Sequence, residues 1–411
     1  MSWETVILGD LCSVITKGTT PSNIGASFTD RGIKYIRSEM LTSAKYVTGD
    51  FLYISQETHE RLKRSQLQTG DILFSMAGVY LGKTAILRAE DTPSNTNQAV
   101  ALIRIDPNKC NNEYVYYYLN IPEVVKTANT VQSQSAQPNI NLKQIGHLKI
   151  KLPDVDTQAK IVEILSAYDN LIESNQKQVK LLEEAAQRLY KEWFVDLRFP
   201  GYEDTPIIDG VPEGWSYKPL SDLFSFVRGK SYTSKELSDT SGVLMVNLKN
   251  IRAFGGYNRN AEKRFTGKYK DEQALNPGDL VMGVTDMTQE RRLVGHTAIV
   301  PDLGEPMTFS MDLIKLVPLS IQKSYLYSSL YYGGYSFKIS PLANGVNVLH
   351  LKPEAIMSLQ MLVPTEELMD AYGKVFDPIQ SRIELLQKQI DTATESRDRL
   401  LPKLMSGEIE V

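Results

Sequence analysis

The chain has 411 residues, 42% of them hydrophobic and 23% charged, and a formal net charge of −4. This composition is typical of a globular protein with enough apolar residues for two substantial cores. No stretch approaches about 18 uninterrupted apolar residues, and no basic segment precedes an apolar one at the N-terminus, so we expect neither a membrane span nor a secretory signal. The two cysteines, Cys12 and Cys110, lack the spacing of metal ligands, which favours a reducing, cytoplasmic location.

The sequence of residues 3–152 is repeated in residues 215–362. Gly82–Ile86, for example, corresponds to Gly295–Ile299, and similar matches extend over the whole of each copy. Two copies are fewer than the roughly three units that a solenoid needs. The repeat therefore predicts two similar globular domains, at 1–152 and 211–362. A helix with a linker at 153–210 follows the first, and a C-terminal helix at 363–411 follows the second.

The first copy predicts a mixed α/β domain. Short β-rich runs are separated by Gly, Asn, Ser and Thr clusters, and a late aromatic run is typical of a short helix or of core packing. The β-rich runs are 33–36, 71–74, 85–87 and 100–105, and the aromatic run is 114–119.

Polar loops of the first copy hold side chains that can read base edges or grip phosphates. The candidates for nucleic-acid contact are Lys17, Thr19, Thr20, Arg37, Ser38, Lys63, Arg64, Asn97, Gln98 and Gln134. Most polar loops of proteins contact only solvent. The alternative for each of these residues is therefore a solvated side chain that does not contact nucleic acid.

Residues Ala77–Thr84 fit a relaxed phosphate-loop pattern, in which backbone amides and a lysine cradle a nucleotide. Three features count against nucleotide binding. Ala77 replaces the first glycine, a predicted strand follows instead of a helix, and the second copy has His296 where this one has Lys83.

A long amphipathic helix follows the first copy. Asp154, after Pro153, is a candidate cap for its start, and Pro200-Gly201 should stop it. Its seam advances by alternating steps of four and three residues, which is a heptad pattern. The seam comprises Tyr168, Ile172, Asn175, Val179, Leu182, Ala186, Leu189 and Trp193.

The second copy has the same organisation, with an aromatic run at 325–332. Its candidates for nucleic-acid contact are Arg228, Lys230, Asn247, Lys249, Asn250, Arg291, Arg292 and Asn344. Corresponding positions are polar in both copies but differ in identity, as with Arg37 and Asn247. Two readers of different sequences would show this pattern.

A second heptad helix ends the chain. Its seam comprises Ile379, Ile383, Leu386, Ile390, Ala393, Arg397, Leu400 and Leu404. Thr365, after Pro364, is the candidate cap. Pro402 should end or kink this helix, and Gly407 follows.

Two similar seams in one chain most simply bury each other, and pseudo-symmetry favours an antiparallel, coiled-coil-like spacer. A helix of about 38 residues would extend about 57 Å. The polar seam residues Asn175 and Arg397 would reduce stability but help to fix the register. The alternative is that each helix packs on its own copy.

The charge is unevenly distributed. Each globular copy carries a net +3, whereas residues 153–210 carry −6 and residues 363–411 carry −4. Basic domains joined by acidic helices favour a polyanion partner for the domains and protein partners for the helices. Ordinary variation in composition is the alternative.

Catalytic signatures are missing. The sequence has no adjacent prolines, which excludes the Asn/Asp-Pro-Pro-aromatic signature of amino-methyltransferases, and no acidic-x-Lys nuclease signature. The four histidines, His59, His147, His296 and His350, are isolated from one another and predict no metal site.

Four segments carry a resemblance to a known family. They are Val211-Pro212-Glu213-Gly214-Trp215, the helix ending Arg188–Phe194, the terminus Leu400–Ile409 and Gln137-Pro138-Asn139-Ile140. Over its full length the chain resembles the specificity subunit of type I restriction-modification enzymes. Gly345-Val346-Asn347-Val348 is a looser form of the last of these segments.

This resemblance implies a non-catalytic subunit whose two target recognition domains each bind one half of a bipartite double-stranded DNA site. The helices would set the spacing and dock two methyltransferase subunits, which bring S-adenosylmethionine. Endonuclease-translocase subunits, using ATP and magnesium, would join them. The alternatives are a stand-alone regulator of a bipartite operator and a nucleotide-binding enzyme that uses Lys83.

Overall fold

The computed structural model describes residues 3–42, 44–130 and 139–411. The chain forms two compact units. Unit 1 comprises residues 1–176 and 388–411, and unit 2 comprises residues 177–387. Each unit thus combines one globular copy with parts of both long helices, whereas the sequence predicts four consecutive segments.

Unit 1 is built on a four-stranded antiparallel sheet in the order β2-β9-β6-β7. These strands are β2 (Cys12–Lys17), β9 (Val100–Ile105), β6 (Ile72–Ser75) and β7 (Thr84–Ile86). Successive side chains of a strand point to opposite faces. In β6, Ile72 and Phe74 enter the core beside the helices, whereas Leu73 enters a smaller core with residues of the second sheet. The apolar runs are therefore strands buried on both faces.

The second sheet of unit 1 has the order β4-β3-β8-β5. Its central strands, β3 (Ile33–Ile36) and β8 (Ser94–Thr96), are parallel, and β4 (Leu52–Ile54) and β5 (Gln66–Leu67) pair antiparallel at the edges. A two-stranded ladder of β1 (Glu4–Ile7) and β10 (Lys149–Leu152) joins the two ends of the copy. The short helices are α1 (Leu8–Leu11), α2 (Gln56–Arg61), α3 (Asn112–Leu119), α4 (Pro122–Thr130) and α5 (Leu142–Gly146).

Unit 2 repeats this architecture. Its first sheet has the order β14-β23-β19-β21 and its second the order β15-β17-β16-β22-β18, again with one parallel pair, β16 with β22. The ladder that joins the ends of the copy is β13 with β25. The strands are β13 (Ser216–Pro219), β14 (Phe224–Arg228), β15 (Leu237–Ser238), β16 (Val243–Val246), β17 (Lys263–Phe265), β18 (Ala274–Leu275), β19 (Leu280–Gly283), β21 (Thr297–Ile299), β22 (Met307–Phe309), β23 (Leu313–Pro318) and β25 (Gln360–Val363).

The remaining elements of unit 2 are short. The helices are α7 (Leu220–Leu223), α8 (Lys323–Tyr331) and α9 (Tyr335–Ile339), and the small ladders are β11 (Ile207–Ile208) with β12 (Val211–Pro212) and β20 (Thr285–Asp286) with β24 (Leu349–His350).

Most of the expected local elements are confirmed. The predicted strands at 33–36 and 100–105 coincide with β3 and β9, and the strands predicted at 71–74 and 85–87 overlap β6 and β7. The two aromatic runs form α3 and α8, whose tyrosines lie mostly in the core. Asn111 caps α3, because its side chain accepts the backbone N–H groups of Glu113 and Tyr114.

Two long helices follow the globular copies, α6 (Val155–Tyr190) with a π-helical turn at Lys191–Val195, and α10 (Glu366–Ser406). Asp154 and Thr365 cap their starts as expected, accepting the N–H groups of Thr157 and Leu368. In the described part of the chain, no helix has the length and apolar composition that a membrane crossing requires.

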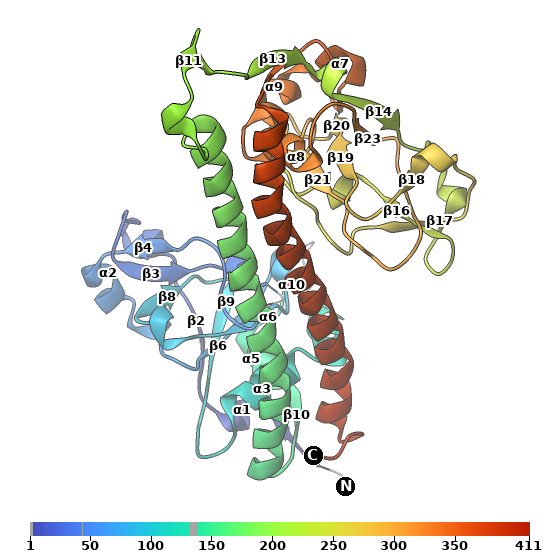
Figure 1. The fold of residues 1–411 in the computed structure, drawn as a ribbon. Helices are drawn as coiled ribbons and strands as arrows, with labels where there is room; N and C mark the ends of the chain where they lie inside the picture. Colours follow the sequence, from blue (N-terminus) through green and yellow to red (C-terminus); the bar gives the residue numbers. More distant parts are fainter. Residues whose placement is uncertain (1–2, 43, 131–138) are drawn as a thin grey trace. The chain divides into compact units, whose positions relative to one another are not determined.

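Within each unit the two long helices run side by side and antiparallel (Figure 1). In unit 1, the amide of Asn175 donates to Gln389 Oε1 over 3.1 Å, and Asp169 pairs further along with Arg397. In unit 2, Arg382 approaches Gln178 at 3.5 Å. As the residue number on α6 increases, the residue number of its partner on α10 decreases, as expected for antiparallel helices. The expected mixed α/β class with a helical spacer is confirmed.

The seam residues are buried or half-buried without exception. Val179 on α6 and Ile383, Leu386 and Ile390 on α10 are buried. Pro402 was expected to end or kink the second helix, and the first of these outcomes is wrong, since α10 continues to Ser406 and Gly407 then adopts a φ of 77°. The reason is tertiary: Leu401, Leu404 and Met405, on both sides of the proline, lie in the core of unit 1.

The polar seam residue Arg397 belongs to a buried network in unit 1. Its Nη1 lies 2.7 Å from Asp169 Oδ1, and the Tyr117 hydroxyl donates to Asp169 Oδ2 over 2.6 Å. Burial, together with the Asp169 charge, raises the pKa of Tyr117 above its usual value, so this hydroxyl stays protonated and donates. The network ties α3 of the globular copy to both long helices.

Removing one partner from this network should be costly. The Asp169 side chain is only 4% exposed and that of Arg397 only 16%, so Arg397→Met leaves a buried carboxylate without its counterion. We expect unit 1 to lose about 3 kcal/mol of unfolding free energy, measured by denaturant titration. The double variant Asp169→Leu with Arg397→Met should recover most of the loss. No recovery would show that the ion pair is not what makes Arg397 important.

Candidate nucleic-acid interface

The candidate residues of unit 1 gather where two parallel strands end. In the β3/β8 register, Ile36 lies opposite Thr96, so Arg37 and Asn97 follow at the same edge of the sheet. Ser38 begins the 3₁₀ turn that follows Arg37. The carboxyl ends of parallel strands are frequent binding edges, because the loops that leave them converge.

The loop after β2 lies against this edge. Its backbone N–H at Thr19 donates to the carbonyl of Thr96 over 3.0 Å, and Arg64 Nη2 donates to Thr19 Oγ1 over 3.0 Å. The Thr20 hydroxyl donates to Gln98 Oε1. The fold therefore brings together residues that are far apart in sequence, which we call the unit 1 loop cluster: Lys17, Thr19, Thr20, Arg37, Ser38, Lys63, Arg64, Asn97 and Gln98.

Gln134 lies outside the described residues. Its expected contact with nucleic acid stays a prediction.

Glycine makes this close approach possible. A Cβ on Gly18 would lie 1.9 Å from the Thr96 carbonyl oxygen. In unit 2, a Cβ on Gly229 would lie 2.0 Å from the Ser310 carbonyl oxygen. In both copies, a glycine thus allows the loop after the first strand of the first sheet, β2 or β14, to lie directly against the end of the parallel strand pair.

Unit 2 follows the same path. Val246 of β16 lies opposite Phe309 of β22, and the backbone N–H of Lys230 donates to the Phe309 carbonyl over 2.7 Å. Ser310 and Met311 stand where unit 1 has Asn97 and Gln98. The sequence analysis missed these two, because no polar run marks them. The matched parallel register is the signal that would have found them.

Several cations of these loops make no ion pair with a protein carboxylate. In the described ranges, no carboxylate lies within ion-pair distance of Lys17, Lys63 or Arg64 in unit 1, or of Lys249 in unit 2. Others are paired: Arg37 with Glu39 at 2.8 Å, Arg228 with Glu354 at 2.7 Å, and Arg292 with Glu290. The uncompensated cations are suited to bind phosphates.

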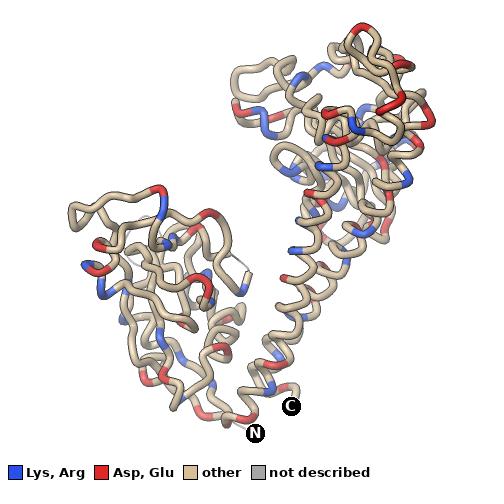
Figure 2. The backbone as a smooth tube through the Cα atoms, turned by 60° about the vertical axis from the view of Figure 1, so that its left-hand side comes forward, with Lys and Arg blue, Asp and Glu red and all other residues tan. Residues whose placement is uncertain are grey.

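Basic residues alternate with acidic ones over both units and do not form one block (Figure 2). The net charge of a globular copy therefore does not by itself mark an interface. The uncompensated cations at the strand ends are the more specific signal.

Asn247 and Asn250 must be removed from the candidate contacts. Both are buried, and they cap the 3₁₀ turn Leu248–Asn250. The amide of Asn250 donates to the Asn258 carbonyl and to Glu262, and that of Asn247 donates to the carbonyl of Ala261. Because their amide groups donate inside the protein, these asparagines are not placed to contact bases. They instead form the turn that leaves Lys249 exposed.

The other candidates of unit 2 lie on different loops. Arg291 and Arg292 are in the loop of residues 287–292, and the exposed Asn344 pairs through its backbone with His350. The amide of Gln289 donates to the carbonyl of Val346 over 2.8 Å, which joins these two loops. Gly283 lies against both Leu293 and Leu248, so the first loop adjoins the turn that holds Lys249.

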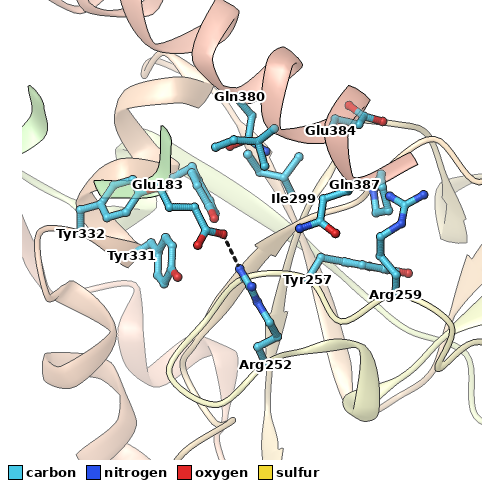
Figure 3. A pocket seen from close by; sticks show the side chains of 14 residues that line it. Glu183, Arg252, Tyr257, Arg259, Ile299, Tyr331, Tyr332, Gln380, Glu384 and Gln387 are labelled. Carbon is cyan, nitrogen blue, oxygen red and sulfur yellow. Dashed lines mark hydrogen bonds and ion pairs between the residues drawn. The ribbon is translucent and has the colours of Figure 1, made fainter. Parts of the chain in front are cut away.

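Charged contacts attach loops of the globular copies to the long helices. In unit 2, Arg252 pairs at 2.9 Å with Glu183 of α6, in a pocket lined by Tyr331, Tyr332 and α10 residues (Figure 3). On α10, Glu384 accepts the backbone N–H of Asp302 over 2.7 Å. These two contacts hold the segments of Arg252 and Asp302 against α6 and α10.

The corresponding contact in unit 1 uses a different partner. Glu173, which occupies on α6 the position of Glu384 on α10, pairs with Arg88 at 2.5 Å, and the Arg88 guanidinium stacks 3.6 Å from the centre of the Tyr46 ring.

The segment Ala77–Thr84 does not have the form of a phosphate loop. A 3₁₀ turn at Gly78–Tyr80 leads into β7, so a strand follows and not the helix whose N-terminus such a loop requires. Among the described residues, no group of three His, Cys, Asp or Glu side chains could hold a metal ion.

Comparison with known proteins shows one consistent family. A family model, the type I restriction modification DNA specificity domain, matches residues 1–184. The chain is similar to the type I restriction enzyme MjaIX specificity subunit of Methanocaldococcus jannaschii, with 24% identity covering 100% of this chain and 94% of the relative. It is also similar to the HindI specificity subunit of Haemophilus influenzae, with 22% identity covering 84% and 88%.

The fold is that of a solved S subunit from a type I restriction-modification system of M. genitalium. The TM-score is 0.63 at 15% identity, over 98% of this chain and 96% of that one.

Replacing Gly18 tests the architecture of the loop cluster. Gly18→Ala must push the loop away from Thr96, because backbone cannot yield as a flexible side chain does. We expect weaker nucleic-acid binding by unit 1, measured by fluorescence anisotropy. Gly146→Ala is the matched control: its Cβ would meet only Ile15 Cδ1, at an ordinary 3.6 Å. Equal effects of the two substitutions would contradict this assignment.

Proposed function

We propose that this chain, which belongs to the specificity subunits of type I restriction-modification enzymes, binds double-stranded DNA at a bipartite site, with one half-site for each unit. The observation that carries the proposal is the repeated loop cluster at the parallel strand ends. In both units a glycine lays a basic loop on this edge, and uncompensated cations surround it. Basic side chains would bind the phosphates, and neighbouring polar side chains would contact bases.

The two units would read different sequences. The residues that follow the parallel strands are Arg37, Asn97 and Gln98 in unit 1, but Ser310 and Met311 in unit 2, where the exposed cation Lys249 lies in the turn after β16. Guanidinium and amide groups make directional hydrogen bonds to base edges, whereas a thioether offers an apolar contact. A shared scaffold with different side chains at its edge supports recognition of two unlike half-sites.

The long helices would separate the two half-sites by a set distance and dock two methyltransferase subunits. S-adenosylmethionine would then be bound by those subunits, and ATP and magnesium by endonuclease-translocase subunits, in the cytoplasm. Two features support this division. The helices are acidic while the globular copies are basic, and no catalytic signature occurs in the sequence.

The purified chain alone should neither methylate nor cut DNA. Activity should appear when methyltransferase subunits are added, and it can be followed by transfer of labelled methyl groups. Methyl transfer by the chain alone would refute the assignment of chemistry to partners. Tight sequence-specific binding and gene regulation by the chain alone would instead favour a regulator.

Single substitutions should affect one half-site each. Arg37→Ala should weaken binding through the first half-site and Lys249→Ala through the second, each by about 1–3 kcal/mol. The measurement is DNA affinity with either half-site scrambled, at several salt concentrations. Lys374→Ala, an exposed lysine on α10, is the control. Loss of discrimination at both half-sites from one substitution would contradict the division of labour.

Lengthening the spacer should change the accepted separation of the half-sites. Because α10 lies alongside α6, one heptad is inserted after Val179 and another in the facing turn near Leu386. Seven residues add about 10 Å of helix, or about three base pairs. Methylation of a library with varied spacers reports the preferred length. An unchanged preference would show that the helices do not set the distance.

A further inference from the structure

Two phenylalanines of unit 2 form an exposed stack. Phe254 is 46% and Phe337 57% exposed, and their rings lie 6.1 Å apart at an angle of 27°. The buried His296 ring lies nearly perpendicular to both, at 87° to Phe254 and 79° to Phe337, with centroids 5.6 Å and 5.2 Å away. Burial lowers the pKa of His296, which keeps the supporting ring uncharged at neutral pH.

The backbone that presents Phe254 is strained. Its φ of 66° lies in the left-handed region, which is rare and strained for a bulky residue. Its N–H donates to the carbonyl of Arg292 over 2.7 Å, and Arg291 beside it has a φ of 53°. Strain that holds an aromatic side chain in solvent points to a contact outside the protein.

The adjoining loop is also firmly held. The buried Asp286 carboxylate accepts the backbone N–H groups of Thr288 and Leu293, over 2.8 Å and 2.7 Å, and so closes the loop of residues 287–292. Met287, in this loop, is 77% exposed. Val346, in the loop that Gln289 joins to it by a hydrogen bond, is 89% exposed. We call the stacked pair of Phe254 and Phe337 the aromatic patch; Met287 and Val346 lie in the adjoining loops.

The border of the patch is basic. Lys338 follows Phe337 directly. Arg292, whose carbonyl accepts the Phe254 N–H, lies with Arg291 in the adjoining loop, and the exposed Glu290 of that loop pairs with Arg292. Within the described residues, Arg291 Nε is buried without a hydrogen-bond acceptor. An apolar surface framed by cations fits DNA, whose bases are apolar on their faces and whose phosphates are negative.

We propose that the aromatic patch makes an apolar contact with the bases of the second half-site, an inference that rests on the proposed function. Phenylalanine rings can stack on an exposed base, enter a base step, or pack on a thymine methyl group. The contact is specific to unit 2, since the position of His296 is occupied by Lys83 in unit 1. The two half-sites are thus bound by different chemistry.

The test uses Phe254→Gly, Phe337→Ala and the double variant, each assembled with the methyltransferase subunits. Glycine adopts the φ of residue 254 without strain, so this variant should keep the loop and its thermal stability. We expect each single variant to lose roughly tenfold in affinity for the complete site, because each removes one aromatic contact with a base. Leu319→Ala, which removes a 61% exposed apolar side chain from the same unit, should bind as the parent does.

Modified DNA identifies the contact. A 2-aminopurine in the second half-site should brighten on binding to the parent but not to the double variant if a base is unstacked. Replacing thymine by uracil should weaken the parent and not the double variant if a methyl group is contacted. Either result supports the proposal.

Three outcomes separate the possible failures. Unchanged affinity of the double variant, with second half-site discrimination intact, would overturn the patch proposal and leave the proposed function standing. Loss of assembly with the methyltransferase subunits would make the patch a protein-docking surface and would overturn it too. If the parent itself discriminates neither half-site, the proposed function fails.

Discussion

The antiparallel pairing of the two long helices is the constraint on which the rest of the structure depends. Neither globular copy completes its core alone. In unit 1, Leu401, Leu404 and Met405 from the end of the chain lie in the same core as Ile161 and Leu165 of α6. Residues more than two hundred positions apart must therefore meet before this core closes, and the free energy of burying them holds the first copy and the end of the chain together.

In unit 2, aromatic rings join the globular copy to the two long helices. Phe194, just after α6, lies 4.7 Å from Tyr325 of α8 and 4.9 Å from Tyr372 of α10, measured between ring centroids. Edge-to-face contacts of this kind add to the apolar burial. Loops of both globular copies are in turn attached to the long helices through Glu173, Glu183 and Glu384. A polar group at each of these positions has a defined partner, which fixes the orientation of the loops as well as their attachment.

The buried polar residues show why a seam can tolerate charge. Arg397 interrupts an apolar heptad pattern, and its desolvation would be unfavourable if it stood alone. Asp169 accepts from the Arg397 guanidinium, and the protonated Tyr117 hydroxyl donates to the other oxygen of that carboxylate. Asn247 and Asn250 show the reverse case. As polar residues of a loop they were expected to contact a ligand, but their side chains instead cap the 3₁₀ turn Leu248–Asn250. Whether a polar side chain is free to bind a ligand depends on its neighbours in the folded protein, and the sequence composition does not give those neighbours.

The sequence by itself determined the two copies, the β-rich runs, the aromatic helices and the heptad seams, because these follow from local periodicity and from repetition along the chain. It also marked most of the polar loops. Only the tertiary structure decided which loops meet at the parallel strand ends, which cations lack a counterion, and that α10 continues through Pro402. It also revealed the stack of Phe254 on Phe337. Such features depend on contacts between residues distant in sequence, and packing energy there overrides local propensity.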